Sequence, residues 1–202
     1  MSPIKPAPLT RINLHAATVL LVDPNAQSLT VLMQAFHGFG AQGTVRAETL
    51  AEAKDAARCR TLDLVVCEGP FPDGDDGYDF VAWLRCSQLE PNAYAPIILT
   101  SAHVSHDNVA RARDCGANFI VAKPISPTVL LERILWVARE NRPWVECEAY
   151  SGPDRRFKNE GPPLGVEGRR STDLSATVGF AKMPNMSQNE IDGLMMPKRA
   201  VL

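Results

Sequence analysis

Residues 19–25 are VLLVDPN, residues 63–68 are DLVVCE, residues 96–101 are PIILTS and residues 119–124 are FIVAKP. Each stretch is a short run of branched apolar residues that ends in a polar or charged residue. Strands covered by helices on both faces have this nearly continuous apolar character. The runs therefore predict buried strands over residues 18–22, 64–67, 96–100 and 119–122, and we expect all four to be central strands.

The segments between these runs have helical patterns. Leu29, Leu32, Met33 and Phe36 recur at helical spacing before the stop signals Gly38 and Gly40. Further helices are predicted over residues 51–58, 78–85, 107–115 and 127–141, and the more polar residues 42–47 suit an edge strand. This alternation of strands and helices predicts five βαβ-type units, which form one doubly wound α/β domain with a parallel sheet.

The two ends of the chain differ in composition from this central region. Residues 1–15 are expected to be a flexible leader, residues 16–142 the domain, and the proline-containing residues 143–202 a largely disordered tail. The 202-residue chain has a net charge of -2, which gives no bulk attraction to nucleic acid. No apolar run approaches the roughly 18 residues of a membrane span, and five scattered cysteines suggest a reduced, cytoplasmic setting.

Polar side chains follow the predicted strands at the points where each strand ends. They are Asp23 with Pro24, then Glu68, Ser101 and Lys123. Ligands of open parallel sheets bind beyond the carboxyl ends of the strands, where the strand order reverses. We therefore expect these side chains to converge in one pocket.

The chain resembles the receiver domain of bacterial two-component response regulators. The resemblance is carried by VLLVDPN, DLVVCEGPFPDGDDGYDF, PIILTSA and GANFIVAKPISP, in the right order and spacing, over about residues 16–141. It implies a flavodoxin-like five-stranded sheet of order 2-1-3-4-5. It also implies an aspartate at the end of the third strand that accepts a phosphoryl group, with Mg²⁺ held by an acidic pair after the first strand.

Two positions depart from the family pattern. Glu68 stands at the acceptor position and Pro24 at the second position of the acidic pair, while Ser101 and Lys123 are retained. Mg²⁺ requires near-octahedral oxygen ligands, and a proline side chain offers none. The longer glutamate side chain also displaces the carboxylate. In a reaction that depends on exact placement of the reacting groups, a misplacement of about 1 Å can lower the rate on the order of 100-fold. We expect no bound metal, no cofactor and no enzymatic step.

Lys123 is expected to form a fixed ion pair with Glu68, which turns the pocket into a structural strut. The alternative is residual phosphate or metal chemistry that uses Asp73, Asp75 or Asp76 in the adjoining loop. Ile120 stands where receivers often carry an aromatic switch residue. By the same resemblance, the Lys123-Pro124 peptide bond is expected to be cis.

A short helix is predicted near residues 187–195 of the tail. Ser187 and Glu190 have the spacing of a capping box, and Ile191, Leu194 and Met195 lie on one helical face. The segment resembles the N-terminal peptide of the flagellar motor-switch protein, which docks on an activated receiver. Docking on a partner and docking on the chain's own domain both remain open.

Two arginine pairs also lie in the tail, Arg155 with Arg156 and Arg169 with Arg170. Their guanidinium groups have the fork geometry that binds phosphates or a cyclic dinucleotide, although neighbouring acids weaken such a site. The leading hypothesis is a non-phosphorylatable receiver that acts as a protein-binding adaptor in two-component or motility signalling. The alternatives are a phosphorelay acceptor with a substitute acid and a cyclic-dinucleotide sensor.

Overall fold

The computed structural model describes residues 14–72, 74, 76–140, 142–147, 150–155 and 186–195. Five parallel strands form one sheet in the order β2-β1-β3-β4-β5, which confirms the predicted doubly wound fold. The strands are β1 (Thr18–Val22), β2 (Gly43–Ala47), β3 (Leu64–Glu68), β4 (Ile97–Ser101) and β5 (Phe119–Ala122). They match the predicted strands to within two residues at each end.

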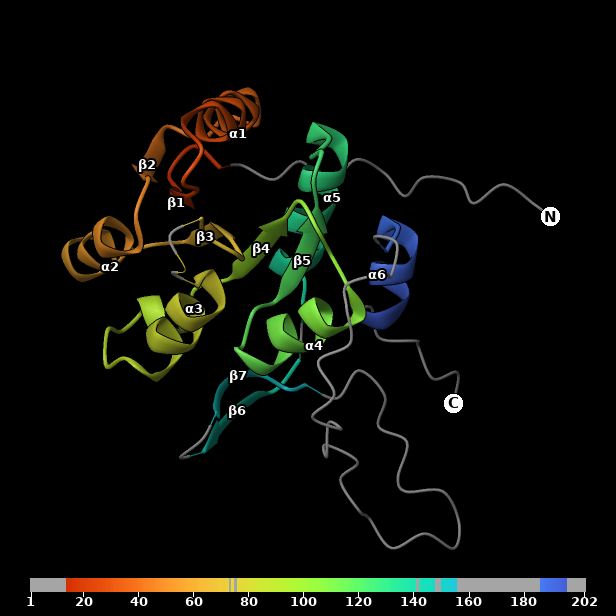
Figure 1. Cartoon of the computed structure of the whole chain (residues 1–202). Helices are drawn as coiled ribbons and strands as arrows, with labels where there is room; N and C mark the ends of the chain where they lie inside the picture. Colours follow the sequence, from red (N-terminus) through yellow and green to blue (C-terminus); the bar gives the residue numbers. More distant parts are fainter. Residues whose placement is uncertain are drawn as a thin grey trace, which may run out of the picture.

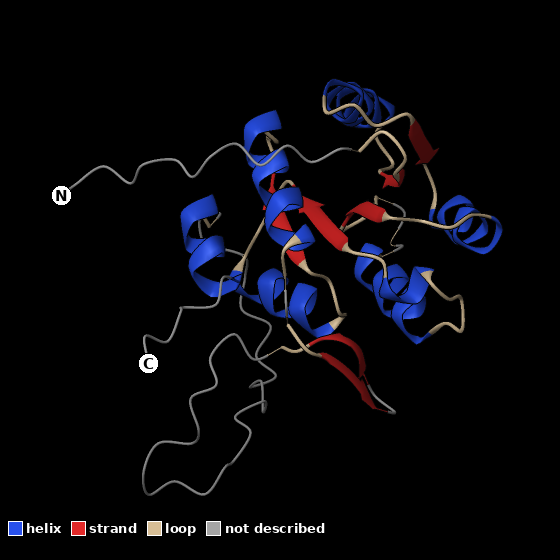
Figure 2. Ribbon diagram, turned by 180° about the vertical axis from the view of Figure 1, so that it is seen from behind, coloured by secondary structure: helices blue, strands red, loops and turns tan. Residues whose placement is uncertain are grey.

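Helices cover both faces of the sheet. Figure 1 shows α1 and α5 on one side and α2, α3 and α4 on the other, and the view from behind in Figure 2 agrees. Their bounds are α1 (Ala26–Gly38), α2 (Leu50–Cys59), α3 (Gly77–Cys86), α4 (His106–Asp114) and α5 (Pro127–Ala138), with a 3-10 turn η1 (Asn92–Tyr94). No helix in the described ranges is long and apolar enough to cross a bilayer.

Helix starts are fixed by short polar side chains. Asn25, Thr49, Asp76 and Ser105 precede α1 to α4, and each accepts a hydrogen bond from a backbone N–H of the first turn. Leu29, Leu32 and Phe36 of α1 are buried against the sheet, as their spacing predicts. The core therefore lies on both faces of β1, β3 and β4.

The position of β5 agrees with the strand order 2-1-3-4-5 that the family resemblance implies, but not with the prediction from its apolar sequence alone. Its apolar sequence predicted a central strand, whereas the structure places it at the border of the sheet beside β4. Phe119, Ile120 and Val121 are nevertheless fully buried. A short helix, α6 (Gln188–Met195), lies beside β5 and accounts for part of this burial (Figure 1).

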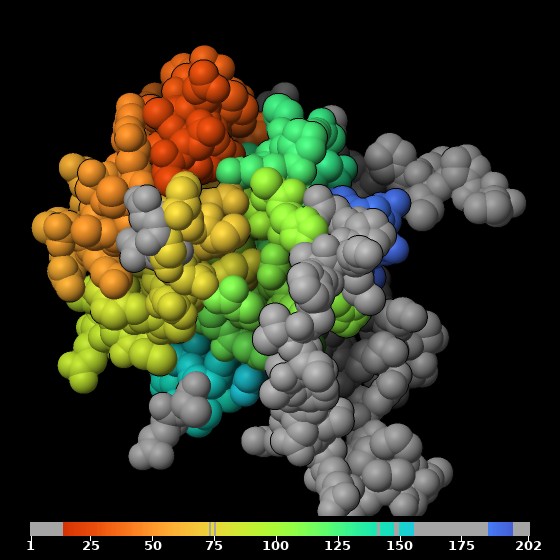
Figure 3. Space-filling model, viewed as in Figure 1, coloured from red at the N-terminus to blue at the C-terminus, as the bar shows by residue number. Residues whose placement is uncertain are grey.

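The region after Pro143 also differs from the predicted tail. Residues that were assigned to it form an antiparallel hairpin of β6 (Trp144–Cys147) and β7 (Tyr150–Pro153). Figure 3 shows this hairpin, in teal, packed against the surface of the domain. Tyr150 is buried there, and Trp144 lies 4.9 Å from the Arg85 guanidinium and 5.0 Å from the Tyr94 ring. The hairpin needs few apolar residues of its own, because it packs on the surface that α3 and η1 form.

Candidate functional site

Three charged side chains meet at the carboxyl ends of the strands. Asp23 follows β1, Glu68 ends β3 and Lys123 follows β5, so the parallel sheet brings them to one edge. The Lys123 Nζ lies 2.6 Å from Asp23 Oδ2 and 2.5 Å from Glu68 Oε2. Asp23 is 1% exposed and Glu68 is 6% exposed. One ammonium group thus bridges two buried carboxylates.

Two oxygens of this cluster accept further hydrogen bonds. Asp23 Oδ1 accepts a hydrogen bond from the Asn25 backbone N–H at 2.8 Å. Glu68 Oε2 accepts a second hydrogen bond, from the Thr100 hydroxyl at 2.9 Å. Buried charges are tolerated when they are paired and hydrogen-bonded in this way.

The pKa values of the pair are set by burial and by the contacts. Burial raises the pKa of the Glu68 carboxyl above its ordinary value, and this effect outweighs the opposing hydrogen bonds from Lys123 and Thr100. For Lys123, burial acts to lower the pKa, but the hydrogen bonds to Asp23 and Glu68 outweigh it and raise the pKa. Lys123 is therefore held in its charged form.

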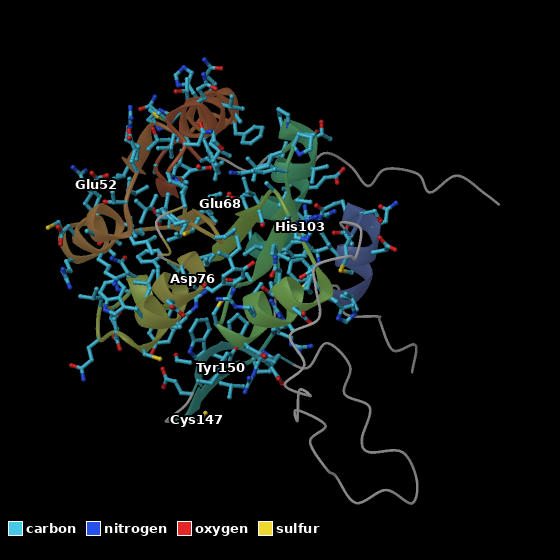
Figure 4. All side chains as sticks on the ribbon, viewed as in Figure 1. Glu52, Glu68, Asp76, His103, Cys147 and Tyr150 are labelled. Carbon is cyan, nitrogen blue, oxygen red and sulfur yellow. The ribbon has the colours of Figure 1, made fainter. Side chains whose placement is uncertain are left out.

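Thr100, and not Ser101, supplies the hydroxyl that contacts Glu68. Thr100 lies opposite Glu68 in the parallel register of β3 and β4. The Ser101 hydroxyl instead donates to the His103 carbonyl at 2.8 Å and accepts from the His103 N–H at 3.2 Å. The Ser101 hydroxyl thus binds the backbone of the loop after β4. Figure 4 labels Glu68 and His103 near the same end of the sheet.

The backbone beside Glu68 requires a glycine at the start of α3. A Cβ atom on Gly77 would lie 1.8 Å from the Glu68 carbonyl oxygen, and the Gly77 N–H donates to Gly69 O at 2.6 Å. Asp76, just before it, caps α3 by accepting from the Tyr78 N–H at 2.8 Å and pairs with Arg111. Asp76 is thus engaged at the helix start, while Asp73 and Asp75 lie outside the described residues.

The residues present do not fit the Mg²⁺ ion that the receiver resemblance implies. Pro24 contributes no side-chain oxygen, and both oxygens of Asp23 already have donors. Among the described residues, no group of three His, Cys, Asp or Glu side chains is placed to hold a metal ion. We therefore assign no step of any mechanism to a bound metal.

Two further family positions are resolved at β5 and the residues after it. Ile120 stands at the position where receivers often carry an aromatic switch residue. It is fully buried in the middle of β5. The Lys123-Pro124 peptide bond is cis, as the resemblance predicted, and Glu90-Pro91 is also cis. The second cis bond was not predicted from the sequence.

The tail segment forms the helix α6 with its predicted capping contacts. The Ser187 N–H donates to Glu190 Oε2 at 2.8 Å, and the Glu190 N–H donates to the Ser187 hydroxyl at 3.4 Å. Ile191 and Met195 are fully buried, whereas Leu194 is 37% exposed. The buried face is therefore narrower than the predicted ridge of three residues.

Of the four arginines in the two tail pairs, only Arg155 lies within the described residues. Its Nη1 atom is 3.2 Å from Asp114 Oδ1, and its guanidinium lies 4.3 Å from the centre of the Tyr150 ring. These contacts engage Arg155 with the domain surface. Arg156, Arg169 and Arg170 lie outside the described residues.

Sequence reasoning missed three residues that hold α6 in place, namely Arg133, Gln188 and Asp192. Arg133 of α5 pairs with Asp192, and the Gln188 side chain accepts a hydrogen bond from the Ala122 N–H at 3.2 Å. The available signal was the pair of charged residues, Glu132 and Arg133, within the otherwise apolar pattern of residues 129–137. Its partner could not be inferred, because the two residues are 59 positions apart.

A family model described as the response regulator receiver domain matches residues 19–135. The phosphate regulon transcriptional regulatory protein PhoB of Pseudomonas aeruginosa is 28% identical over 126 residues, which cover 62% of this chain and 53% of that protein. The chain thus spans about half the length of this relative. The chemotaxis protein CheY of the same species is 24% identical over 116 residues, which cover 57% of this chain and 91% of that protein.

Among solved structures, the chemotaxis protein CheY4 of Vibrio cholerae has the same fold. It aligns with a TM-score of 0.55 and 22% identity over 60% of this chain and 98% of that chain. The hairpin β6–β7 and the helix α6 lie beyond the residues that the family model matches. They are additions to the shared fold.

Proposed function

Because the chain belongs to the response regulator receiver family, we propose that it signals by binding protein partners in a two-component or motility circuit, without an aspartyl phosphate. The observation that carries this proposal is the bridge from Lys123 to both Asp23 and Glu68. Both buried carboxylates of the pocket are thereby paired with one ammonium group. The protein is then an adaptor and not an enzyme.

The chemistry of the pocket supports a constitutive state. A phosphoryl group and Mg²⁺ act together in phosphoryl transfer, since the metal neutralises the charge that develops. Here Pro24 removes a ligand position, and the ammonium of Lys123 neutralises the carboxylates instead. The longer glutamate side chain carries its charge further from the strand than an aspartate would, which favours contact with Lys123 and Thr100.

Binding is proposed to use the face formed by β5 and α5 together with the helix α6. A flagellar or chemotaxis partner is consistent with the similarity of the chain to chemotaxis protein CheY. The tail segment adds the resemblance to a motor-switch peptide that its sequence carries. Arg155, Arg156, Arg169 and Arg170 are not needed for this role.

The test is a reaction of the full-length chain with Mg²⁺ and acetyl phosphate, followed by intact-mass measurement and mapping of any modified residue. We expect no phosphoryl adduct on the native chain. The matched control is the double variant Pro24→Asp with Glu68→Asp, which restores the two short acids and is expected to gain an acid-stable, base-labile adduct at position 68.

Two outcomes would count against the proposal. An acyl phosphate on any carboxylate of the native chain would show a working receiver with a substitute acid. A double variant that stays unmodified would mean that the two departures at positions 24 and 68 are not what blocks the chemistry. Calorimetry with cyclic dinucleotides tests the third candidate, and we expect no heat of binding.

A further inference from the structure

The helix α6 covers an exposed edge of the sheet. In the strand order, β5 is a border strand, so alternate backbone N–H groups of β5 point away from β4. The Ala122 N–H is one of these, and it donates to Gln188 Oε1 at 3.2 Å. At the start of the segment, the Met186 N–H donates to Val104 O at 2.9 Å, on the loop between β4 and α4. Residues 186–195 are thus fastened to two separate parts of the domain.

The contact has an apolar centre. Ile191 and Met195 are both 0% exposed and belong to the same cluster of buried side chains as Val104 and Phe119. Their spacing of four residues puts them on one side of the helix. A helix of eight residues is too short to be stable alone in water, so α6 depends on this surface for its structure.

A charge pair lies beside the apolar centre. The Arg133 side chain of α5 is 7% exposed. Its guanidinium lies 5.1 Å from the Phe119 ring centre and pairs with Asp192 of α6. Gln188 Nε2 donates to Asp192 Oδ1 at 3.0 Å and fixes the carboxylate. Without α6, the domain presents a cation at the edge of an apolar surface. That surface fits an acidic amphipathic helix and disfavours a basic one.

We propose that residues 186–195 are an autoinhibitory cap on the face formed by α4, β5 and α5, and that a partner helix of the same chemistry binds there only by displacing it. The matching pattern is an apolar residue, an acid directly after it and a second apolar residue four positions after the first, as in Ile191, Asp192 and Met195. This inference rests on the docking role proposed above. It does not depend on whether Glu68 accepts a phosphoryl group.

The strength of the cap follows from its attachment to the same chain. Tethering gives a segment an effective concentration of roughly millimolar near its site. A free helix at micromolar concentration then competes poorly with it. Weakening the cap, while leaving the receiving surface intact, should therefore increase the affinity for an added helix.

The test measures binding of a fluorescein-labelled peptide of residues 186–195 to full-length chains by fluorescence anisotropy, in buffer without Mg²⁺ or phosphodonor. The capped native chain is expected to bind weakly. The variant Ile191→Ala with Met195→Ala removes the apolar contacts of the cap and is expected to bind the peptide about 10-fold or more tightly. Asn189→Ala, at an exposed position of α6, is the matched control and should behave as the native chain.

A third variant tests the charge pair. Adding Arg133→Met to the chain that carries Ile191→Ala and Met195→Ala is expected to abolish the gain in peptide affinity. The reason is that Asp192 of the peptide then has no cation to pair with. Circular dichroism checks that the domain stays folded, and a peptide with Asp192→Lys should fail to bind any of the chains. Equal affinity of the native and uncapped chains would overturn the cap, and absence of binding to both would overturn the receptor face. Neither result bears on the phosphodonor test of the pocket.

Discussion

Among single residues, Lys123 and Glu68 determine the electrostatics of the pocket. Burial raises the pKa of the Glu68 carboxyl above the ordinary value of 4.5. A raised pKa in the folded state means that the folded protein holds this proton more tightly than the unfolded chain does. The associated stability is present below pH 4.5 and is lost as the pH rises through the folded-state pKa.

This linkage predicts that the difference in unfolding free energy between the native chain and the Glu68→Gln variant depends on pH. Glutamine cannot ionise, yet its carbonyl oxygen can accept from Lys123 and Thr100. As the pH rises from 4.5 toward neutrality, the unfolding free energy of the native chain should fall relative to that of the variant. Urea unfolding curves at a series of pH values measure this difference. A difference that is constant with pH would contradict the burial-raised pKa.

At the scale of single elements, the hairpin β6–β7 is held by a buried cation on α3. Arg85 is 2% exposed and donates to the carbonyls of Gly116, Ala93 and Ala95 and to Asn118 Oδ1. Burial lowers the pKa of its guanidinium to about 9, which still leaves it charged at neutral pH. Trp144 of β6 covers the guanidinium, so the hairpin shields this charge from water.

Removing that cover should destabilise the domain and not only the hairpin. For Trp144→Ala we expect a loss of about 2 kcal/mol in unfolding free energy, since truncation of large aromatic side chains costs roughly 3 to 5 kcal/mol when they are fully buried and Trp144 is only half-buried. The matched control is Val145→Ala, because Val145 is the neighbouring residue and is 37% exposed. Chemical denaturation measures both. Equal effects of the two substitutions would mean that the packing of Trp144 on Arg85 does not contribute to the unfolding free energy.

At the scale of the whole molecule, stability should be distributed unevenly. The strands β1, β3 and β4 lie inside the sheet and are almost entirely buried, whereas α6 is joined to the domain by a few contacts at its border. Segments with few buried contacts open locally without global unfolding. A displaceable cap requires this kind of opening.

Native-state hydrogen exchange tests the expected distribution. The backbone amides of α6 should exchange at least about 10-fold faster than those of β3 and β4, because local opening needs less free energy than global unfolding. Ile191→Ala should accelerate exchange in α6 and leave β3 unchanged. If α6 instead exchanges at the rate of the central strands, it is a fixed part of the core and the cap cannot be displaced.

Local sequence patterns predicted the five-stranded sheet, the helices on its faces and the chemical character of the pocket. Each strand of the five-stranded sheet and each helix on its faces is encoded by apolar periodicity and by polar residues within a few positions, whereas the hairpin β6–β7 was not predicted. The departures at Pro24 and Glu68 were likewise visible before any coordinates. These are properties of neighbouring residues, so local patterns suffice to predict them.

Which of these residues meet depends on the tertiary structure. Lys123 and Asp23 are 100 positions apart, and Ala122 and Gln188 are 66 apart, so their contacts depend on how the whole chain packs. The same holds for the choice of Thr100 over Ser101, which follows from the register of β3 and β4. The apolar sequence of β5 predicted a central strand because periodicity reports burial but not what covers the strand. At its border that cover includes α6, a distant segment of the same chain.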